Sequence, residues 1–315
     1  MSKIEILQVG PYPDWDEGPL NEQYTVHRYF EVNDKPAFLH SVGGNVRGVA
    51  CRGESIVDRQ MIELMPRIEI ISVYGVGYDG VDLDACRQRN IRVTNTPDVL
   101  TNDVADLAVA MMLALSRGVI AADHWVRSGA WKEKGPFPLQ HQVKGRRAGI
   151  LGMGRIGHAV GRRLVGFDMP IGYLSRNRRP EGGEWNYFEN PAELAGWADV
   201  LFVTLAATPQ TRHIVNREVL DALGSNGMLI NVSRAANVDE EVLLDALENR
   251  RIGGAALDVF EGEPALNPRF TTLDNVLLQP HQGSGTIKAR KAMGQLMRDN
   301  LSAHFAGKQL LTPVV

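Results

Sequence analysis

The sequence has only two cysteines, Cys51 and Cys86, in 315 residues. They form no C-x-x-C pair, and isolated cysteines in a chain of this length are more often buried small side chains than disulfide partners. No histidine pair has the spacing of a zinc site such as H-E-x-x-H, and no G-x-S-x-G nucleophile elbow is present. These absences argue against a metal hydrolase and a serine hydrolase, and we expect no metal site.

An excess of basic charge and long apolar runs are also missing. Lys and Arg number 34 against 37 Asp and Glu, for a net charge of -3, whereas nucleic acids and anionic membranes bind clustered basic charge. The longest apolar run, Leu107–Leu115, is far shorter than the roughly 20 residues that span a bilayer. The first residues, MSKIEILQVG, are typical of a β-strand rather than a signal peptide. We therefore expect a cytoplasmic protein that binds neither nucleic acid nor membranes.

Short apolar runs alternate with amphipathic stretches, which is the pattern of parallel sheets covered by helices on both faces. At roughly 150 residues per domain, the length predicts two domains. The first series of predicted strands is Ile4–Val9, Ala37–His40, Val46–Ala50, Ile68–Val73 and Ile91–Thr94. Pro97 then interrupts the pattern, Thr101 is a candidate helix cap, and Val104–Leu115 has helical spacing. This arrangement predicts a domain boundary followed by a long helix.

A second series of apolar runs predicts six more strands, with helices that begin near Arg155, Pro191, Arg217 and Asp239. The strands are Ala148–Leu151, Pro170–Leu174, Val200–Thr204, Gly227–Val232, Gly253–Leu257 and Asn275–Leu278. This is the pattern of a complete doubly wound sheet of the dinucleotide-binding type. The tail, Thr286–Phe305, has an apolar helical stripe that we expect to cover the first domain. The chain would then pass twice between the domains, with a cleft between them.

The motif G-x-G-x-x-G occurs twice, at Gly75–Gly80 and at Gly152–Gly157. The second copy follows a predicted strand and opens a predicted helix, so its backbone amides and the positive helix end would face a pyrophosphate. The residues predicted to bind the cofactor there are Gly152, Gly154, Arg155, Ile156 and Gly157.

The first copy of the motif is a poor phosphate site because Asp79, Asp82 and Asp84 crowd the turn and would repel a phosphate. Two interpretations remain open. The glycines form a tight turn from strand to helix, or the amides of Val76 and Gly77 bind a small carboxylate.

The residues after the second strand of the cofactor sheet indicate which nicotinamide cofactor is bound. An NAD site usually has Asp or Glu there, whereas a 2'-phosphate needs donors and positive charge. This chain has Ser175, Arg176, Asn177 and Arg178, with no acid before Glu181. We expect NADPH or NADP as the cofactor, with NADH or NAD less preferred. The alternative is that the segment is a solvated basic loop.

Polar groups also follow the last three predicted strands, at Ser233-Arg234, at Asp258 and Glu263, and at Gln279-Pro280-His281. Hydride transfer to a ketone builds negative charge on oxygen, so it needs a proton donor and a cation. His281 suits the first task and Arg234 the second. A carboxylate beside His281, for which Glu263 is the candidate, would stabilise the imidazolium and keep the donor protonated at neutral pH.

Each residue alone has a simpler explanation, because Arg234 could cap a helix, Glu263 could be a surface charge and His281 could stabilise a turn. Their joint position at strand ends beyond the glycine motif favours the catalytic interpretation. Asp258, closer to its strand, is assigned to the cofactor side, where it accepts from the nicotinamide carboxamide or pairs with a cation.

Several segments resemble, in order and spacing, the D-isomer-specific 2-hydroxyacid dehydrogenase family. They are VTNTPDVLTNDVADLA, GILGMGRIG, NVSRAANVDEEVL, GGAALDVFEGEP and LLQPHQGSGT. The resemblance covers essentially the whole chain and is strongest to the glyoxylate/hydroxypyruvate reductases and the hydroxyphenylpyruvate reductases. It implies an α/β fold of two doubly wound parallel-sheet domains. A Rossmann NAD(P)-binding domain (99–287) would be inserted into a flavodoxin-like substrate-binding domain (1–98 and 288–315).

The resemblance also implies residue roles and an assembly. Arg234, Glu263 and His281 would form the catalytic trio, with His281 the acid and Arg234 the anchor for the substrate carboxylate and carbonyl. Val76 and Gly77 would supply amides to that carboxylate. A homodimer would form through the helix after the NTP segment and the arm beyond it. Further positions implied to contact the cofactor are Val104, Val232, Ser233, Arg234, Asp258, His281 and Gly283.

Three positions bear on substrate choice. Ala235 replaces a glycine that many relatives have after the arginine, and Gln282 occupies a position that is often apolar. Arg52 lies in a loop where it would touch the distal hydroxyls of a substrate. The sequence therefore predicts an NADPH-dependent reductase of short 2-oxo acids, mainly glyoxylate and hydroxypyruvate, that forms D-2-hydroxy acids. The alternatives are an NADH-linked reductase of a bulkier acid such as hydroxyphenylpyruvate, and a non-catalytic nucleotide-sensing protein of the corepressor type.

Overall fold

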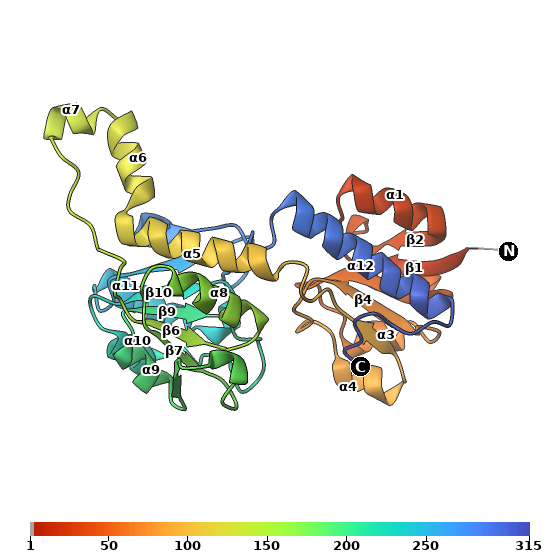
Figure 1. The fold of residues 1–315 in the computed structure, drawn as a ribbon. Helices are drawn as coiled ribbons and strands as arrows, with labels where there is room; N and C mark the ends of the chain where they lie inside the picture. The colour runs from red at the N-terminus through yellow and green to blue at the C-terminus, as the bar shows by residue number, and fades with distance from the viewer. Residues whose placement is uncertain (1–2) are drawn as a thin grey trace. The chain divides into compact units, whose positions relative to one another are not determined.

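A computed structural model describes residues 3–315, which form two compact units. One unit consists of the chain up to Leu100 together with Thr286–Val315, and the other is Thr101–Gly285. The second unit is therefore inserted in the sequence of the first, whose parts are red to orange and dark blue in Figure 1. Each unit contains one parallel sheet, as the alternating pattern predicted.

The first unit is built on a five-stranded sheet with the order β2-β1-β3-β4-β5. This is the flavodoxin-like order that the resemblance implied. Its strands are β1 (Ile4–Gln8), β2 (Tyr24–Arg28), β3 (Val46–Arg52), β4 (Ile70–Tyr74) and β5 (Arg92–Thr94). Its helices are α1 (Asp14–Gln23), α2 (Lys35–Val42), α3 (Arg59–Glu63), α4 (Leu83–Gln88) and α12 (Ile287–Phe305).

The tail helix α12 returns to this first unit, as its apolar stripe predicted. It begins after Thr286, whose hydroxyl accepts the N–H of Ala289 at 3.1 Å. Met293, Met297 and Leu301 are buried on the face that packs against β4, and α1 packs beside it. The other face of the sheet is covered by a core to which α2, α3 and α4 contribute.

The predicted strand Ala37–His40 was wrong, because these residues lie inside helix α2. Asp34 caps the helix by accepting the N–H of Ala37 at 3.1 Å, and Pro36 occupies the first turn, where proline lacks only an N–H that has no helical partner. A short apolar run does not distinguish a strand from a helix, and this cap was the overlooked signal. The second strand of this unit is instead β2, which pairs with β1 and was not predicted from the sequence.

The second unit has a seven-stranded sheet with the order β12-β11-β10-β9-β6-β7-β8. Counted from β6, this is the Rossmann order with one further strand. Its strands are β6 (Ala148–Leu151), β7 (Ile171–Leu174), β8 (Asn186–Phe188), β9 (Val200–Val203), β10 (Met228–Asn231), β11 (Gly254–Leu257) and β12 (Val276–Leu278). Six of them were predicted, and the short β8, which pairs with β7, was missed.

Helices cover both faces of this sheet. Helix α5 packs against α8 and against β10, β11 and β12, whereas α9 packs on β6 and β7 and is followed by α10 and α11. The helices are α5 (Thr101–Arg117), α6 (Val119–Arg127), α7 (Ala130–Lys134), α8 (Arg155–Val165), α9 (Pro191–Trp197), α10 (Arg217–Leu223) and α11 (Glu240–Glu248). The long helix predicted after Pro97 is α5.

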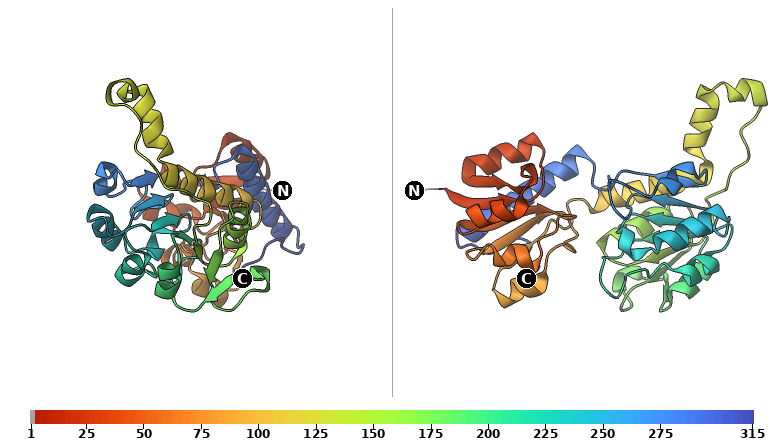
Figure 2. Two further views of the ribbon diagram at one scale, coloured as in Figure 1. Left: turned by 60° about the vertical axis from the view of Figure 1, so that its left-hand side comes forward. Right: turned by 180° about the vertical axis from the view of Figure 1, so that it is seen from behind.

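Helices α6 and α7 extend away from the sheet of the second unit, as Figure 2 shows in yellow. Val119, Ile120, Val126 and Trp131 are large apolar side chains on this arm, and all four are exposed. Among residues 3–315, no single helix is both long and apolar enough to cross a membrane. In the described part of the chain, α5 and α6 taken together are the one pair with the length and apolar composition of a span, and they are bent by 57° at the break.

Cys51 and Cys86 are unpaired and buried, as predicted. Burial, together with the nearby charge of Asp82, raises the pKa of the Cys86 thiol to about 11. A thiol held protonated in this way is a poor nucleophile. Among the described residues, no group of His, Cys, Asp or Glu side chains is placed to hold a metal ion.

Candidate active site

The strands of the second unit end in one row, and the predicted site residues follow this row. Leu151 of β6 is in register with Leu174 of β7 and with Val203 of β9. Val203 is in register with Asn231 of β10, and the row continues through Leu257 of β11 to the end of β12. Segments that are far apart in the sequence therefore leave the sheet at one edge, on both sides of the point where the strand order reverses. This is where doubly wound sheets bind ligands.

The glycine turn between β6 and α8 begins with Gly152, whose φ of 106° is a conformation that side chains rarely adopt. A Cβ on Gly152 would lie 2.9 Å from the backbone of Thr204 and Leu205, and one on Gly157 would lie 2.1 Å from the carbonyl oxygen of Gly152. Thr204 holds the turn from β9, since its hydroxyl donates to the same carbonyl at 2.7 Å. These two glycines are required for packing within the protein.

Gly154 differs from its neighbours, because a Cβ added there would meet nothing within 4 Å. Gly154 and Arg155 are exposed at the N-terminus of α8, where the first amides of a helix have no helical partner. The open space in front of this positive helix end fits a pyrophosphate. Ile156 is half-buried in the same turn.

His281 and Glu263 are brought together from two different loops. Nδ1 of His281 lies 2.6 Å from Oε2 of Glu263, and Oε1 of Glu263 accepts the backbone N–H of Phe260 at 2.9 Å. The imidazole is about one-third exposed, so its second nitrogen remains available to a ligand. In this arrangement the carboxylate fixes the orientation of the imidazole and stabilises its charged form.

The charge state of Glu263 follows from its surroundings. Burial by itself raises the pKa of the Glu263 carboxyl, but the hydrogen bonds from His281 and from the Phe260 amide and the positive charge of Arg234 outweigh it and hold the pKa below its usual value. Glu263 is therefore ionised at neutral pH, as a partner for an imidazolium must be.

Asp258 holds the loop that carries His281. Its Oδ1 accepts the N–H of Gln282 at 2.8 Å, and its Oδ2 accepts the N–H of Gly283 at 2.8 Å. His281 has a φ of 50°, the left-handed conformation that non-glycine residues seldom adopt, and the two amides that follow it are fixed by this carboxylate. Burial raises the pKa of Asp258 although both amide bonds oppose the shift. These contacts are with backbone amides, not with the cation that was one of the two partners expected from the sequence.

Gly283 also lies against Val104 of α5. A Cβ on Gly283 would approach Asp258 Oδ2 to 3.1 Å and a methyl of Val104 to 3.3 Å. The buried Val104 therefore packs against the same loop.

Arg234 is held by an asparagine that the sequence analysis missed. The amide oxygen of Asn231 accepts both the N–H of Ser233 at 3.0 Å and its hydroxyl at 2.8 Å, and the Asn231 NH₂ donates to the carbonyl of Arg234 at 3.2 Å. The guanidinium donates to the carbonyl of Ser233 at 2.9 Å. Asn231 thus shapes the turn after β10, where Val232 and Ser233 are buried and Arg234 is half-buried.

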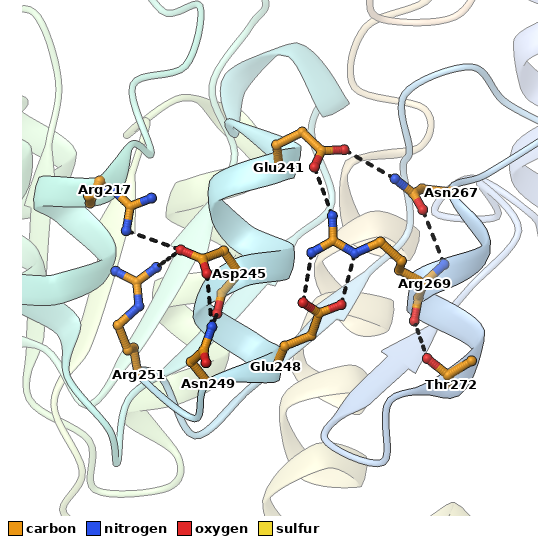
Figure 3. Close-up of polar contacts among 9 residues, drawn as sticks. All are labelled: Arg217, Glu241, Asp245, Glu248, Asn249, Arg251, Asn267, Arg269 and Thr272. Carbon is orange, nitrogen blue, oxygen red and sulfur yellow. Dashed lines mark hydrogen bonds and ion pairs between the residues drawn. The ribbon is translucent and has the colours of Figure 1, made fainter.

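Contacts with helix α11 hold the loop that carries Glu263, both before and after this residue in the sequence. The side chain of Glu240 accepts the N–H of Glu261 at 2.9 Å. Farther along, Arg269 in the 3-10 helix η4 (Pro268–Thr272) donates to Glu241 at 2.8 Å and to Glu248 at 2.7 Å. Figure 3 shows this network around Arg269. These contacts explain how an irregular loop keeps Glu263 at His281.

The segment after β7 has the composition predicted for a 2'-phosphate site. The hydroxyl of Ser175 donates to the carbonyl of Asn177 at 2.5 Å, and Arg176 and Arg178 are exposed. Neither arginine forms an ion pair with any residue between 3 and 315. Both guanidinium groups are therefore available for an external anion.

The remaining predicted substrate residues, Arg52, Val76 and Gly77, belong to the first unit. The turn Gly75–Gly77 follows β4 and is fixed by the segment after β5, where the N–H of Thr96 donates to the Gly75 carbonyl at 2.8 Å. The side chain of Asn95 donates to the Val76 carbonyl at 2.8 Å. Arg52 ends β3, in register with Tyr74 at the end of β4.

Comparisons with known proteins agree with this architecture. The family model described as "D-isomer specific 2-hydroxyacid dehydrogenase, NAD binding domain" matches residues 109–283. The chain is 45% identical over 315 residues to a hydroxyphenylpyruvate reductase of Plectranthus scutellarioides and to a glyoxylate/hydroxypyruvate reductase A of Arabidopsis thaliana, with 100% of each chain covered. It is 40% identical to a 2-ketogluconate reductase of Gluconobacter oxydans, covering 100% of this chain and 99% of that one.

Two solved structures are similar over the whole chain. A 2-hydroxyacid dehydrogenase of Ketogulonicigenium vulgare is 61% identical with a TM-score of 0.93, covering 100% of this chain and 99% of that one. An NADPH-dependent glyoxylate/hydroxypyruvate reductase of Sinorhizobium meliloti, in complex with NADP and malonate, is 38% identical with a TM-score of 0.91. The match covers 100% of this chain and 97% of that one.

Proposed function

The chain belongs to the D-isomer-specific 2-hydroxyacid dehydrogenase family, and from this premise we propose that it uses NADPH to reduce glyoxylate and hydroxypyruvate to the hydroxy acids, a D-2-hydroxy acid in the second case. The relatives establish the broader activity: the protein is an NAD(P)-dependent 2-oxo acid reductase of the glyoxylate/hydroxypyruvate or hydroxyphenylpyruvate type. The non-catalytic alternative has no support from these relatives, which are named as reductases.

We assign the proton-transfer step to His281. As the 2-oxo carbon is reduced, its oxygen gains negative charge, and an imidazolium within hydrogen-bond reach delivers the proton that neutralises it. Glu263 keeps the ring oriented through Nδ1, so that Nε2 faces the substrate. Arg234 holds the substrate carboxylate and carbonyl by charge-assisted hydrogen bonds. When bound, the nicotinamide supplies the hydride.

The contact between His281 and Glu263 carries this proposal. It is tested by following absorbance loss of NADPH and of NADH with a panel of 2-oxo acids, for the native protein and for His281→Ala. We expect turnover with glyoxylate and hydroxypyruvate that is strongly reduced in the variant. Turnover confined to hydroxyphenylpyruvate with NADH would favour the alternative reductase, whose name the Plectranthus relative bears.

We propose that the first unit binds the substrate and the second unit the cofactor. The amides of Val76 and Gly77 would take the substrate carboxylate, which favours the carboxylate interpretation of the first glycine motif over the plain turn. Ser175, Arg176 and Arg178 would take the 2'-phosphate. Two observations support these assignments. Asn95, after β5, holds the turn at Val76, and Arg176 and Arg178 are exposed and unpaired within the described chain.

We further propose a homodimer that buries the arm α6–α7. Its exposed apolar residues, Val119, Ile120, Val126 and Trp131, are the supporting observation, because large apolar side chains gathered on one projection are typical of an interface. Light scattering of the native protein should give twice the monomer mass of 34.7 kDa. Ile120→Glu with Val126→Glu should shift it toward the monomer, and a native monomer would contradict the proposal.

A further inference from the structure

The loop after β3 lies directly beside the turn that we assign to the substrate carboxylate. Arg52, the last residue of β3, is in register with Tyr74, the last residue of β4. The following residues are in close contact, since a Cβ on Gly75 would lie 3.2 Å from the Cα of Gly53. Whatever binds to Val76 and Gly77 therefore has the segment Arg52–Ser55 as its neighbour within the same unit.

This segment presents a paired donor and acceptor. Nε of Arg52 lies 2.6 Å from Oε1 of Glu54, and the side chains are 35% and 49% exposed. The hydroxyl oxygen of Ser55 accepts the N–H of Arg52 at 3.1 Å, and the N–H of Ser55 donates to the Arg52 carbonyl at 3.0 Å. The stem of Arg52 rests on Gly10, where a Cβ would lie 3.2 Å from its Cδ. The position of the pair is thus set by backbone contacts.

The chemistry of the pair selects against two kinds of substrate group. Glu54 neutralises the charge of Arg52, so a second anionic group on the substrate would gain little binding energy beside this pair. Tyr12 and Tyr74, whose rings lie close to Arg52, are buried and stacked on each other at 5.1 Å, so these two rings offer no open face to another ring. A hydroxyl group both donates and accepts hydrogen bonds, which matches an arginine beside a carboxylate.

We propose that Arg52 and Glu54 form a specificity site for hydroxyl groups on the substrate carbons beyond the 2-oxo carbon. The enzyme then favours hydroxylated 2-oxo acids, including sugar acids longer than hydroxypyruvate, over aromatic ones. This inference rests on the proposed function, because it requires a substrate carboxylate at Val76 and Gly77.

The test compares kcat/KM with NADPH for glyoxylate, hydroxypyruvate, 2-ketogluconate and phenylpyruvate. Glyoxylate has no carbon beyond the oxo carbon, so it serves as the internal reference for the reaction itself. For the native protein we expect 2-ketogluconate to exceed phenylpyruvate. In Arg52→Leu, the ratio of kcat/KM for 2-ketogluconate to that for glyoxylate should fall about tenfold or more, the effect expected for losing a charge-assisted hydrogen bond.

Two further variants keep the test decisive. Glu54→Gln, at an exposed position, should lower the same ratio even if Arg52→Leu fails to fold. Arg87→Leu removes an arginine of the same unit that is likewise paired with a carboxylate, Asp84 on α4, and it should leave the ratio unchanged. A native preference for phenylpyruvate, or an unchanged ratio in Glu54→Gln and in a folded Arg52→Leu, would overturn the specificity site. Absence of turnover with every acid, including glyoxylate, would instead overturn the proposed function.

Discussion

Nδ1 of His281 lies 2.6 Å from Oε2 of Glu263, although the two residues come from separate loops after β11 and β12. This contact determines which nitrogen of the imidazole can meet a ligand. Nδ1 is occupied by Glu263, so Nε2 is the nitrogen left for the ligand. The other carboxylate oxygen is held by the Phe260 amide, so Glu263 cannot turn away without losing two hydrogen bonds.

Glu263→Gln should therefore reduce catalysis without abolishing it. The amide keeps the size of the side chain but not its charge, so it no longer stabilises the imidazolium that delivers the proton. We expect kcat/KM for glyoxylate reduction to fall about 10- to 100-fold at neutral pH, in line with hydrogen bonds to charged groups. Steady-state kinetics at saturating NADPH measures this, and an unchanged kcat/KM would show that the carboxylate does not act on His281.

The same residue predicts a pH dependence of stability. Although burial raises the pKa of Glu263, its bonds to His281 and Phe260 and the charge of Arg234 hold the pKa below the usual 4.5. A carboxyl with a lowered pKa in the folded state stabilises the protein above the unfolded pKa, and this contribution is lost as pH falls through the folded value. Urea unfolding should therefore show the native protein more stable than Glu263→Gln at pH about 7, with the difference shrinking below pH about 4.5. A difference that grows in acid would contradict this.

The glycines of the cofactor turn should respond differently to the same substitution. A Cβ at Gly154 meets nothing within 4 Å, so Gly154→Ala should fold normally but bind NADPH more weakly, because the methyl enters the space assigned to the pyrophosphate. A Cβ at Gly157 would lie 2.1 Å from a backbone oxygen, so Gly157→Ala should lower the melting temperature. Thermal melts and NADPH titrations of both variants measure the contrast. Equal effects on both properties would refute the division of roles.

The two exposed arginines after β7 predict the cofactor preference. Replacing Arg176 and Arg178 by Gln should weaken NADPH binding far more than NADH binding, because charge-assisted hydrogen bonds to a phosphate contribute about 1.5–3 kcal/mol each. Isothermal titration with both nucleotides measures the difference, and Arg67→Gln, at an exposed arginine of the first unit, is the control. If the preference of the double variant stays that of the native protein, these arginines do not read the 2'-phosphate.

Much of this arrangement is predictable from sequence because parallel strands end at one edge. That rule, together with the glycine pattern and the chemistry of hydride transfer, pointed to the motif after β6, to Arg234 after β10 and to His281 after β12. The rule fails where a contact has no local pattern. Asp258 fixes the amides of Gln282 and Gly283, which are 24 and 25 residues away in the sequence, and nothing in the intervening residues encodes that pairing.

The other predictions that were wrong or missing concern short helices and strands. Residues 37–40 are apolar enough for a strand, yet the cap at Asp34 and the first-turn Pro36 make them helical. The strands that were missed, β2 and β8, lie at sheet edges, and each pairs in parallel with the strand before it in the sequence, β1 and β7, across a crossover segment. Tertiary pairing rather than local propensity determines such segments.

The most direct test of the account is the rate of His281→Gln measured together with its affinity for NADPH, with His40→Gln on the exposed part of α2 as the control. If His281 delivers the proton, kcat/KM for glyoxylate reduction should fall by about 10²- to 10⁴-fold, whereas the dissociation constant of NADPH changes far less. The control should match the native protein in both. A His281→Gln variant that reduces glyoxylate at the native rate would contradict the account.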